Sequence, residues 1–383
     1  MKFVLSRIPL SEYLSQYKII SLIIDKLSFL FLYSIRAINK LFAYKSDNIV
    51  IISLHRLGDS IFTIPAINEI QRFYSKKIII VCYPESIPIY KMAFDSVENI
   101  SYCELLERDF SFRKRLASFS GRKKIKSLKP SLIIDFLGSM LSASLIFNVR
   151  TQKTTGNNNI FFRYLYDDFV QPRNSPQLID IYLDIASKLV PSVKNERTTF
   201  KKNPESIRPE GYILVQPFAG WKEKEWPLNK FISLLKKLDI EYNVRLLVPD
   251  SSISKDVFDE IKKSGIEIII TKTVEELIKT LKECSLFIGN DSGPVNIANF
   301  LGKPSFTIYG GTNPLYTASN EEHQVFTQKL LNCSARQKDK YCITYTSTYA
   351  CSGIQCMNYL SIDEIYKQIN QLTEKHCERK LEG

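Results

Sequence analysis

Glycine-rich ligand loops and short repeats are both missing from this sequence. The 383 residues include only 14 glycines, and none of them forms the Gly-x-Gly-x-x-Gly pattern of dinucleotide-binding loops. No unit of short, fixed period recurs, which excludes solenoids and propellers. A globular protein remains, and this length favours two domains over one.

Long uncharged hydrophobic runs are missing as well. Residues 19–42 are strongly apolar, but Asp25, Lys26, Arg36 and Lys40 interrupt them before about 18 uncharged residues accumulate. We therefore expect no transmembrane helix there, and instead a helix with a broad apolar face. That face carries Ile19, Leu22, Ile23, Leu27, Leu30, Phe31 and Ile35. It fits either a membrane interface or packing on the protein itself.

Acidic residues are outnumbered, because 52 lysines and arginines stand against 40 aspartates and glutamates and give a formal net charge of +12. Such a balance favours an anionic partner, which can be nucleic acid, a phospholipid surface or a phosphorylated substrate. Arginine-rich tracts and aromatic RNA-binding motifs are absent. We therefore predict no nucleic acid partner.

Compact Cys-x-x-Cys pairs, the usual spacing of structural zinc sites, do not occur among the eight cysteines. Cys82, Cys103 and Cys284 stand in apolar surroundings and are predicted to be core thiols. No cleavable signal peptide is evident, so we expect the reducing cytosol and no disulfides. A late group with longer spacing can be either a metal-binding knuckle or free thiols: Cys333, Cys342, Cys351 and Cys356.

Short apolar segments alternate with amphipathic ones, which is typical of a parallel sheet with crossover helices. One series starts at Asn48 and a second at Tyr212, and they are separated by a polar, proline-containing stretch at 191–209. The predicted fold class is α/β, with two Rossmann-like doubly wound domains. The predicted divisions are an apolar helical extension at 1–47, domains at 48–200 and 205–360, and a terminal helix and tail at 361–383.

The first series has a polar turn, residues 55–60, directly after its first strand. Gly58 in this turn lets the backbone approach a ligand, and Asp59 stands where a helix begins. A carboxylate kept ionised at a helix start is a suitable general base for an acceptor hydroxyl. The alternative is that Asp59 is only an N-cap residue.

Two further polar turns follow strands of the second series. The first turn, at 218–227, reads FAGWKEKEWP; its Lys222 and Lys224 can hold a diphosphate, and Gly220 permits close backbone approach. The second turn has Asp291, Ser292 and Gly293 before a helix whose first amides can bind phosphate. The alternative for the 218–227 turn is a solvated loop in which Trp226 and Pro227 begin a helix. Ligands of doubly wound sheets bind at the carboxyl ends of the strands, and the position of all three turns at such ends favours a functional interpretation.

These segments resemble the signature regions of glycosyltransferase family 9, the lipopolysaccharide heptosyltransferases. The similar segments are RLGDSIFTIPAINEI, FAGWKEKEWP and FIGNDSGPVNIANFLGKPSFTIYGGTNP, which stand in the family's order within residues 48–360. The resemblance implies a GT-B fold with its active site in the cleft between the halves. It also implies an inverting transfer of a heptose or similar sugar from a nucleotide-sugar such as ADP-heptose, with no metal or other cofactor required.

Residue roles follow from the same resemblance. It implies Asp59 as the general base, Lys224 as the phosphate cation, and Asp291, Ser292 and Gly293 as the donor loop. The resemblance also implies Asn296 as a donor-binding residue, at a position where the family commonly has histidine. The family commonly has glycine with an acidic residue where this chain has residues 250–252. Because both regions help hold the nucleotide-sugar, a donor other than ADP-heptose is an alternative.

The family's acceptor is a lipid-linked glycan, so we expect a cytoplasmic protein that lies peripherally on the cytoplasmic face of the inner membrane. The alternatives are a related transferase of capsule, O-antigen or protein glycosylation, and a noncatalytic membrane-associated binding module.

Overall fold

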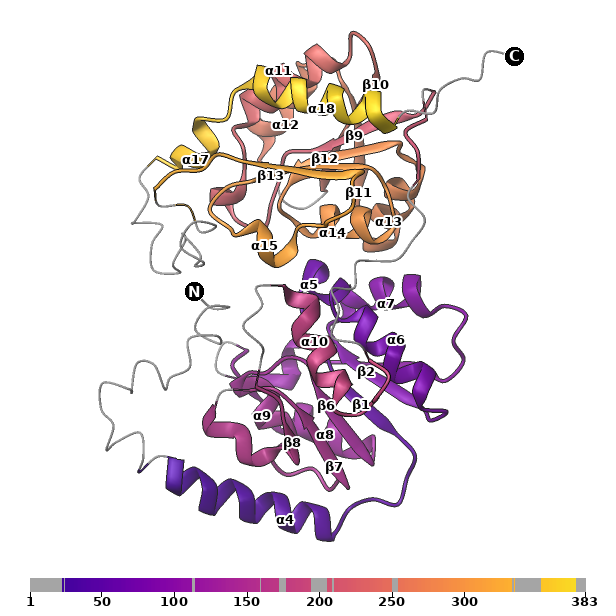
Figure 1. The fold of residues 1–383 in the computed structure, drawn as a ribbon, viewed down its shortest axis with the longest axis vertical. Helices are drawn as coiled ribbons and strands as arrows, with labels where there is room; N and C mark the ends of the chain where they lie inside the picture. The colour runs from indigo at the N-terminus through magenta and orange to yellow at the C-terminus, as the bar shows by residue number, and fades with distance from the viewer. Residues whose placement is uncertain are drawn as a thin grey trace. The chain divides into compact units, whose positions relative to one another are not determined.

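The chain folds into two compact units, Met1–Arg197 and Thr198–Gly383, each built around a parallel sheet (Figure 1). The computed structural model describes residues 23, 25–111, 114–158, 160–171, 177–193, 205–208, 210–249, 254–332, 334 and 353–376. The predicted linker region at 191–209 contains the boundary between the units, and most of it lies outside these residues.

Six parallel strands form the sheet of the first unit, in the order β3-β2-β1-β6-β7-β8. Their bounds are β1 Ile49–Ile52, β2 Ile78–Cys82, β3 Ile100–Glu104, β6 Leu132–Asp135, β7 Lys153–Gly156 and β8 Asp168–Phe169. A small antiparallel hairpin, β4 Phe110–Ser111 with β5 Leu116–Ala117, stands apart from this sheet. Strand order reverses between β1 and β6, and this switch point is where doubly wound sheets bind ligands.

The helices of the first unit cover both faces of that sheet. α6 packs with α10, and α8 packs with α9. The helical segments are η1 Phe29–Tyr33, α4 Ser34–Leu41, α5 Leu57–Ile61, α6 Ile64–Phe73, η2 Pro84–Ser86, α7 Ile87–Phe94, η3 Glu107–Asp109, α8 Phe119–Ser127, α9 Met140–Ile146, η4 Ile160–Leu165 and α10 Leu178–Ser187.

The sheet of the second unit repeats this topology in the order β11-β10-β9-β12-β13-β14. Its strands are β9 Tyr212–Gln216, β10 Asn243–Pro249, β11 Glu267–Thr271, β12 Leu286–Asn290, β13 Ser305–Tyr309 and β14 Gln324–Gln328. The switch point lies between β9 and β12. Two six-stranded sheets of this order are the doubly wound halves that the sequence predicts.

In Figure 1, α11, α12 and α18 lie on one side of the second sheet, and α13, α14 and α15 lie on the other. The helical bounds are η5 Lys222–Lys224, α11 Leu228–Leu238, α12 Lys255–Lys262, α13 Val274–Glu283, α14 Gly293–Phe300, α15 Pro314–Thr317, α17 Gln355–Asn358 and α18 Ile362–His376. The last helix buries Ile365, Ile369 and Leu372 in the core of the second unit.

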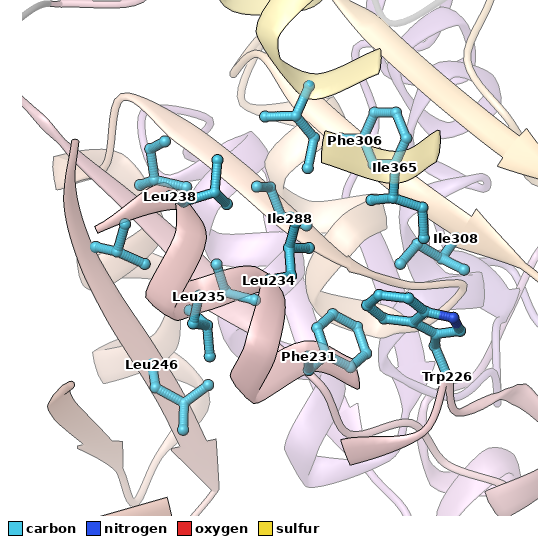
Figure 2. Close-up of a cluster of buried hydrophobic side chains, with 14 of the residues drawn as sticks. Trp226, Phe231, Leu234, Leu235, Leu238, Leu246, Ile288, Phe306, Ile308 and Ile365 are labelled. Atoms are coloured by element: carbon cyan, nitrogen blue, oxygen red, sulfur yellow. The ribbon is translucent and has the colours of Figure 1, made fainter. Parts of the chain in front are cut away.

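Trp226, near the end of the 218–227 turn, packs into the core of the second unit. The indole is 1% exposed, contacts the ring of Phe231 edge-on, and donates from Nε1 to the carbonyl of Leu360 over 3.2 Å (Figure 2). A buried indole with its N–H satisfied stabilises its surroundings through both area and hydrogen bonding. The end of the 218–227 turn is therefore held firmly in the core.

The 55–60 turn contains a short helix that the sequence does not indicate. The sequence predicts a turn there and then a helix from about Ile61 to Tyr74; the structure has that helix as α6, Ile64–Phe73, and adds the five-residue α5 ahead of it. Pro65 lies in the first turn of α6, where its missing N–H costs no helical hydrogen bond. The break falls at Phe62 and Thr63, just after Asp59.

Candidate functional site

The 55–60 turn places Asp59 within α5, at the carboxyl end of β1. The helix has Arg56 as its N-cap residue, so Asp59 lies in the first turn and is not the cap; that alternative is wrong. The Asp59 side chain is half-buried, and Gly58 is buried beneath it. Because α5 has only five residues, its dipole contributes less to a carboxylate than a long helix does.

Buried hydroxyls hold this turn on the sheet. Ser60 donates from Oγ to the carbonyl of Arg56 over 3.1 Å, and Ser86 donates to the carbonyl of His55 over the same distance. The buried hydroxyls of Tyr90 and Ser53 lie 2.7 Å apart and form a hydrogen bond. The backbone that carries Asp59 is thus fixed from below.

The neighbouring strand, β6, ends in a buried carboxylate. Oδ1 of Asp135 accepts the N–H groups of Leu137 and Gly138 over 2.9 and 3.1 Å, and Oδ2 accepts the hydroxyl of Tyr166 over 2.6 Å. Burial raises the pKa of Asp135 even though these donors favour its ionised form. Asp135 therefore shapes the second loop at the switch point of this sheet.

His55, at the start of the same turn, is a buried histidine. Its ring contacts Tyr182 edge-on, and burial lowers the pKa of His55 to about 4 against an opposing hydrogen bond to the backbone of Phe136. The unfolded chain binds this proton below about pH 6.5, whereas the folded chain binds it only below about 4. Folding stability contributed by neutral His55 is therefore complete above pH 6.5 and falls as the pH drops toward 4.

We expect lowering the pH from 7 to 5 to reduce the free energy of unfolding of the first unit by roughly 2 kcal/mol through His55. His55→Gln should remove most of this dependence in urea unfolding followed by circular dichroism. Both tryptophans lie in the second unit, so the pH dependence of tryptophan fluorescence serves as an internal control and should not change. An unaltered pH dependence of the circular dichroism transition in His55→Gln would contradict this assignment.

Three loops of the second unit meet at an ion pair. Nζ of Lys224, in η5 after β9, lies 2.7 Å from Oδ2 of Asp291, which follows β12. The hydroxyl of Thr312, after β13, donates to the same oxygen over 2.8 Å. The carboxylate is 6% exposed and the lysine 18%, so the pair is largely withdrawn from water. The structure thus brings two of the predicted site residues into contact.

The strand residue beside this pair ties the loops together. Asn290 donates from Nδ2 to the carbonyl of Pro217 over 2.6 Å, and its Oδ1 accepts the backbone N–H of Trp226 over 3.0 Å. Glu225 accepts the N–H of Ala219 over 3.0 Å and closes the turn. Lys224 is consequently presented on a rigid loop, with its ammonium 4.9 Å from the ring centre of Trp221.

Ser292 is the N-cap residue of α14, but it makes no side-chain capping bond to the helix. Of the described groups, several buried polar atoms around α14 and α15 have no hydrogen-bond partner: Oγ of Ser292, Oδ1 of Asn296 and Nδ2 of Asn313. An unsatisfied buried polar atom costs about 1–3 kcal/mol, so a group of them indicates a place where a ligand supplies the missing bonds. Pro294 has no backbone N–H, so the first amides that α14 can offer to a ligand are those of Gly293 and Val295.

The remaining predicted donor residues differ in their surroundings. Lys222 begins η5 and is exposed. A Cβ at Gly220 would meet no atom of the described chain within 4 Å, so internal packing does not require glycine there. The sequence analysis did not predict Thr312 and Asn290 as site residues. Both lie in the segment FIGNDSGPVNIANFLGKPSFTIYGGTNP at or just after the end of a strand, and this position could have identified them.

The family model described as glycosyltransferase family 9 (heptosyltransferase) matches residues 121–346, which is more than half of the chain. This chain belongs to glycosyltransferase family 9. The family predicted from the three motifs is therefore confirmed. The matched region includes both loops of the Lys224–Asp291 pair.

Individual relatives agree with the family. Lipopolysaccharide heptosyltransferase 1 of Campylobacter coli is 29% identical over 224 residues, which are 53% of this chain and 63% of that enzyme. Among solved structures, E. coli ADP-heptose lipopolysaccharide heptosyltransferase II has a TM-score of 0.64 at 15% identity, with 86% of this chain and 99% of that chain covered. This likeness confirms the predicted GT-B fold class.

A second solved structure is similar in fold. TibC of enterotoxigenic E. coli, described as an iron-containing dodecameric glycosyltransferase, has a TM-score of 0.54 at 12% identity, with 87% of this chain and 77% of that chain covered. In the present chain Cys333, Cys342 and Cys351 lie outside the described residues, and Cys356 lies in α17. No cluster of potential metal ligands occurs within the described residues.

Proposed function

We propose that this protein transfers a heptose or a similar sugar from a nucleoside diphosphate donor to a lipid-linked glycan, with inversion at the anomeric carbon. The observation that supports this most is the Lys224–Asp291–Thr312 cluster, which gathers three strand ends of the second sheet beside unsatisfied polar atoms. A diphosphate with a sugar attached has the charge and the acceptor oxygens that such a cluster can bind.

In the proposed reaction, Asp59 takes the proton of the acceptor hydroxyl as that oxygen forms a bond to the anomeric carbon. The bond from this carbon to the diphosphate oxygen breaks on the opposite side, and the diphosphate leaves with the electron pair. Lys224 and the first amides of α14 stabilise the charge that develops on the departing oxygens. All of these roles belong to side chains and amides, so we propose that no metal is required.

Asp291 is proposed to have two tasks. Its contact with Lys224 keeps the ammonium on one side of the loop, and its second oxygen can accept hydrogen bonds from sugar hydroxyls. Because Asp291 offsets the charge of Lys224, the diphosphate is also expected to depend on α14 amides and on Lys222. This division differs from a purely cationic phosphate site.

One residue of the predicted donor site favours a second candidate donor. Asn296 stands where the family commonly has histidine, and its Oδ1 is a buried acceptor with no partner in the described part of the chain. The side-chain amide of asparagine and the imidazole of histidine present different donors and acceptors to the hydroxyl groups of a sugar. The second candidate function is therefore transfer of another nucleotide-activated sugar within the cell envelope.

A donor panel tests the proposal. We expect kcat/KM with ADP-heptose to exceed that with GDP- and UDP-sugars by at least about tenfold, the usual scale of discrimination by a few pocket contacts. Product anomers are assigned by NMR, and the assay is repeated in EDTA, where activity should persist. A preference for a GDP- or UDP-sugar would establish the second candidate. Retained configuration, or activity that EDTA abolishes and metal restores, would contradict the proposed mechanism.

The acceptor and the location belong to the same proposal. A lipid-linked glycan is anchored in a bilayer, so the protein is proposed to work at the cytoplasmic face of the inner membrane. None of the described helices is long and apolar enough to cross a membrane. A membrane contact is therefore proposed at the level of the bilayer surface.

A further inference from the structure

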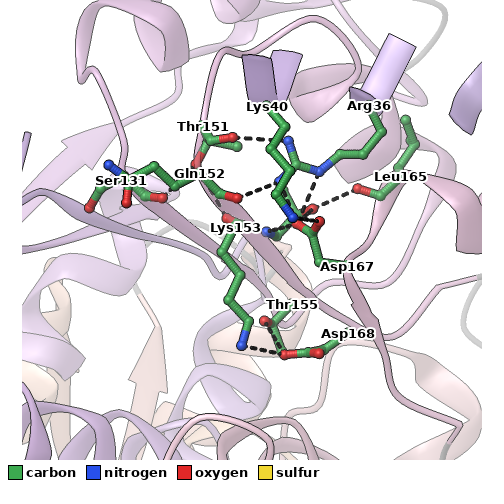
Figure 3. A network of polar contacts seen from close by, with 11 residues as sticks. Arg36, Lys40, Ser131, Thr151, Gln152, Lys153, Thr155, Leu165, Asp167 and Asp168 are labelled. Carbon is green, nitrogen blue, oxygen red and sulfur yellow. Dashed lines mark hydrogen bonds and ion pairs between the residues drawn. The ribbon is translucent and has the colours of Figure 1, made fainter. Parts of the chain in front are cut away.

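The N-terminal helix, residues 25–42, binds the first unit through its polar residues. Arg36 is 6% exposed and donates to the carbonyls of Thr151 and Gln152 over 3.0 Å each, as well as to the carboxylate of Asp167 (Figure 3). Asn39 is 5% exposed and donates to the carbonyl of Phe147 over 3.1 Å. These five hydrogen bonds, two of which join Arg36 to Asp167, leave little freedom for the helix to rotate about its axis.

The partners of Arg36 are themselves held in place. Burial opposes ionisation of Asp167, but the hydrogen bonds and charge of Arg36 outweigh it and lower the pKa of this carboxyl. Lys40 reaches the other oxygen of Asp167 over 3.1 Å, and Asp25 pairs with Arg163 over 2.9 Å. The inner face of the helix is therefore an ionic and hydrogen-bonded one, with Leu32 as its buried apolar residue.

The opposite face of the same helix is apolar and exposed. We call it the outer face and define it by Leu27, Leu30, Ile38, Leu41 and Phe42, which are between 56% and 78% exposed. Phe31 lies at its border, because its ring centre is 5.7 Å from that of Phe147 in the first unit. Single exposed apolar residues are ordinary, but a continuous apolar stripe on a helix surface marks an interaction site. A helix that packs on its own protein in water normally buries its apolar face and exposes its polar face; this helix does the opposite.

Basic residues border the outer face. Lys26, Lys45 and Arg150 are exposed, and the guanidinium of Arg150 lies 5.6 Å from the ring centre of Phe42. The acidic residue of the helix, Asp25, is paired with Arg163. An apolar stripe with a basic border matches the interface of an anionic bilayer, where side chains enter the acyl boundary and cations meet phosphate groups.

We propose that the outer face of residues 25–42 docks this protein on an anionic lipid surface, with the helix parallel to the bilayer. The helix is held in a fixed orientation on the first unit by the hydrogen bonds of Arg36 and Asn39, so its outer face always points away from that unit. The inference deepens the proposed function and rests on it only for its biological purpose, since a lipid-linked acceptor is held at such a surface.

Vesicle flotation tests the proposal with the full-length protein. The probe is a vesicle of phosphatidylethanolamine and phosphatidylglycerol, compared with pure phosphatidylcholine. The variant is L27Q/L30Q/L41Q, which preserves helix propensity while removing three of the most exposed apolar side chains. We expect the partition coefficient on anionic vesicles to fall at least about tenfold. The matched control is F119Q/I240Q, whose parent side chains are 78% and 82% exposed elsewhere, and its binding should not change.

A charge variant covers the case in which the triple variant misfolds. K26E/K45E leaves the apolar residues intact and should lower binding to anionic vesicles at least about tenfold, with little change on phosphatidylcholine. Wild-type protein that does not float, or a triple variant that floats like wild type, would overturn the proposal. So would light scattering in which the wild type forms a dimer that the triple variant loses, because the outer face would then bind a second copy.

Failure of the docking surface and failure of the transferase proposal are distinguishable. Transfer to a water-soluble acceptor fragment is measured for the same proteins, and the triple variant should retain the wild-type rate. If neither protein transfers sugar but only the wild type floats, the docking surface stands without the transferase. If both transfer sugar and both float equally, the transferase stands and the docking surface is refuted.

Discussion

Asp59→Ala should lower the rate of sugar transfer by between about 10²- and 10⁴-fold, the usual contribution of a general base. The carboxylate is half-buried in the first turn of α5, on a backbone fixed by the hydroxyls of Ser60 and Ser86. Removing it leaves that backbone and the second unit intact, so affinity for the nucleotide should change little. Single-turnover transfer and calorimetric titration with ADP measure the two quantities separately.

Two further variants sharpen the test of Asp59. Asp59→Asn keeps the shape of the side chain but cannot accept a proton, so it should lose nearly as much rate as alanine. Asp95→Asn removes an exposed carboxylate elsewhere in the first unit and should behave as wild type. If Asp59→Asn keeps a wild-type rate, the general-base role is refuted, whatever the alanine variant does.

Lys224→Ala should weaken nucleotide binding and slow transfer together, by about 10- to 10³-fold in kcat/KM. A charge-assisted hydrogen bond to phosphate contributes about 1.5–3 kcal/mol, and the same contact strengthens as charge develops on the leaving group. The variant also removes the partner of a carboxylate that is only 6% exposed, which leaves the Asp291 charge uncompensated. Titration with ADP and steady-state kinetics follow the two effects.

A double-mutant cycle separates ligand binding from this internal pairing. Asp291→Asn removes the uncompensated charge, so combining it with Lys224→Ala should recover folding stability without recovering nucleotide affinity. Lys236→Ala removes an exposed lysine of α11 in the same unit and serves as the control. Wild-type ADP affinity in Lys224→Ala would show that this lysine serves Asp291 alone, and the diphosphate role would be abandoned.

The strongest sequence predictions were those that depend on alternation and on strand ends. Buried strands such as Ile49–Ile52 and Ile78–Cys82 are continuous apolar runs, which are typical of a parallel sheet covered on both faces. The weakest concerned short or polar strands: β7 and β8, which carry Lys153 and Asp168, were not predicted because they lack such a run. Their place in the sheet comes from pairing with β6 and with each other.

Site residues divide in the same way. Asp59, Lys224 and Asp291 were predicted because they stand in polar turns that follow buried strands, and their roles came from the resemblance to the family. The contact between Lys224 and Asp291 joins residues 67 apart in sequence, and no local pattern encodes such a contact. Thr312 was missed for this reason, since its role depends on reaching Asp291 from a third strand.

Sequence alone determined the family, the two doubly wound halves and the chemical character of each loop, because these depend on local pattern and on the order of strands. Tertiary structure alone decided that Asp59 is not an N-cap, that Asp291 is the partner of Lys224, and which face of the N-terminal helix meets the protein. Hydrophobicity predicted the apolar face to be a contact of some kind. The buried hydrogen bonds of Arg36 and Asn39 decided its direction, since a buried guanidinium must be placed where acceptors converge.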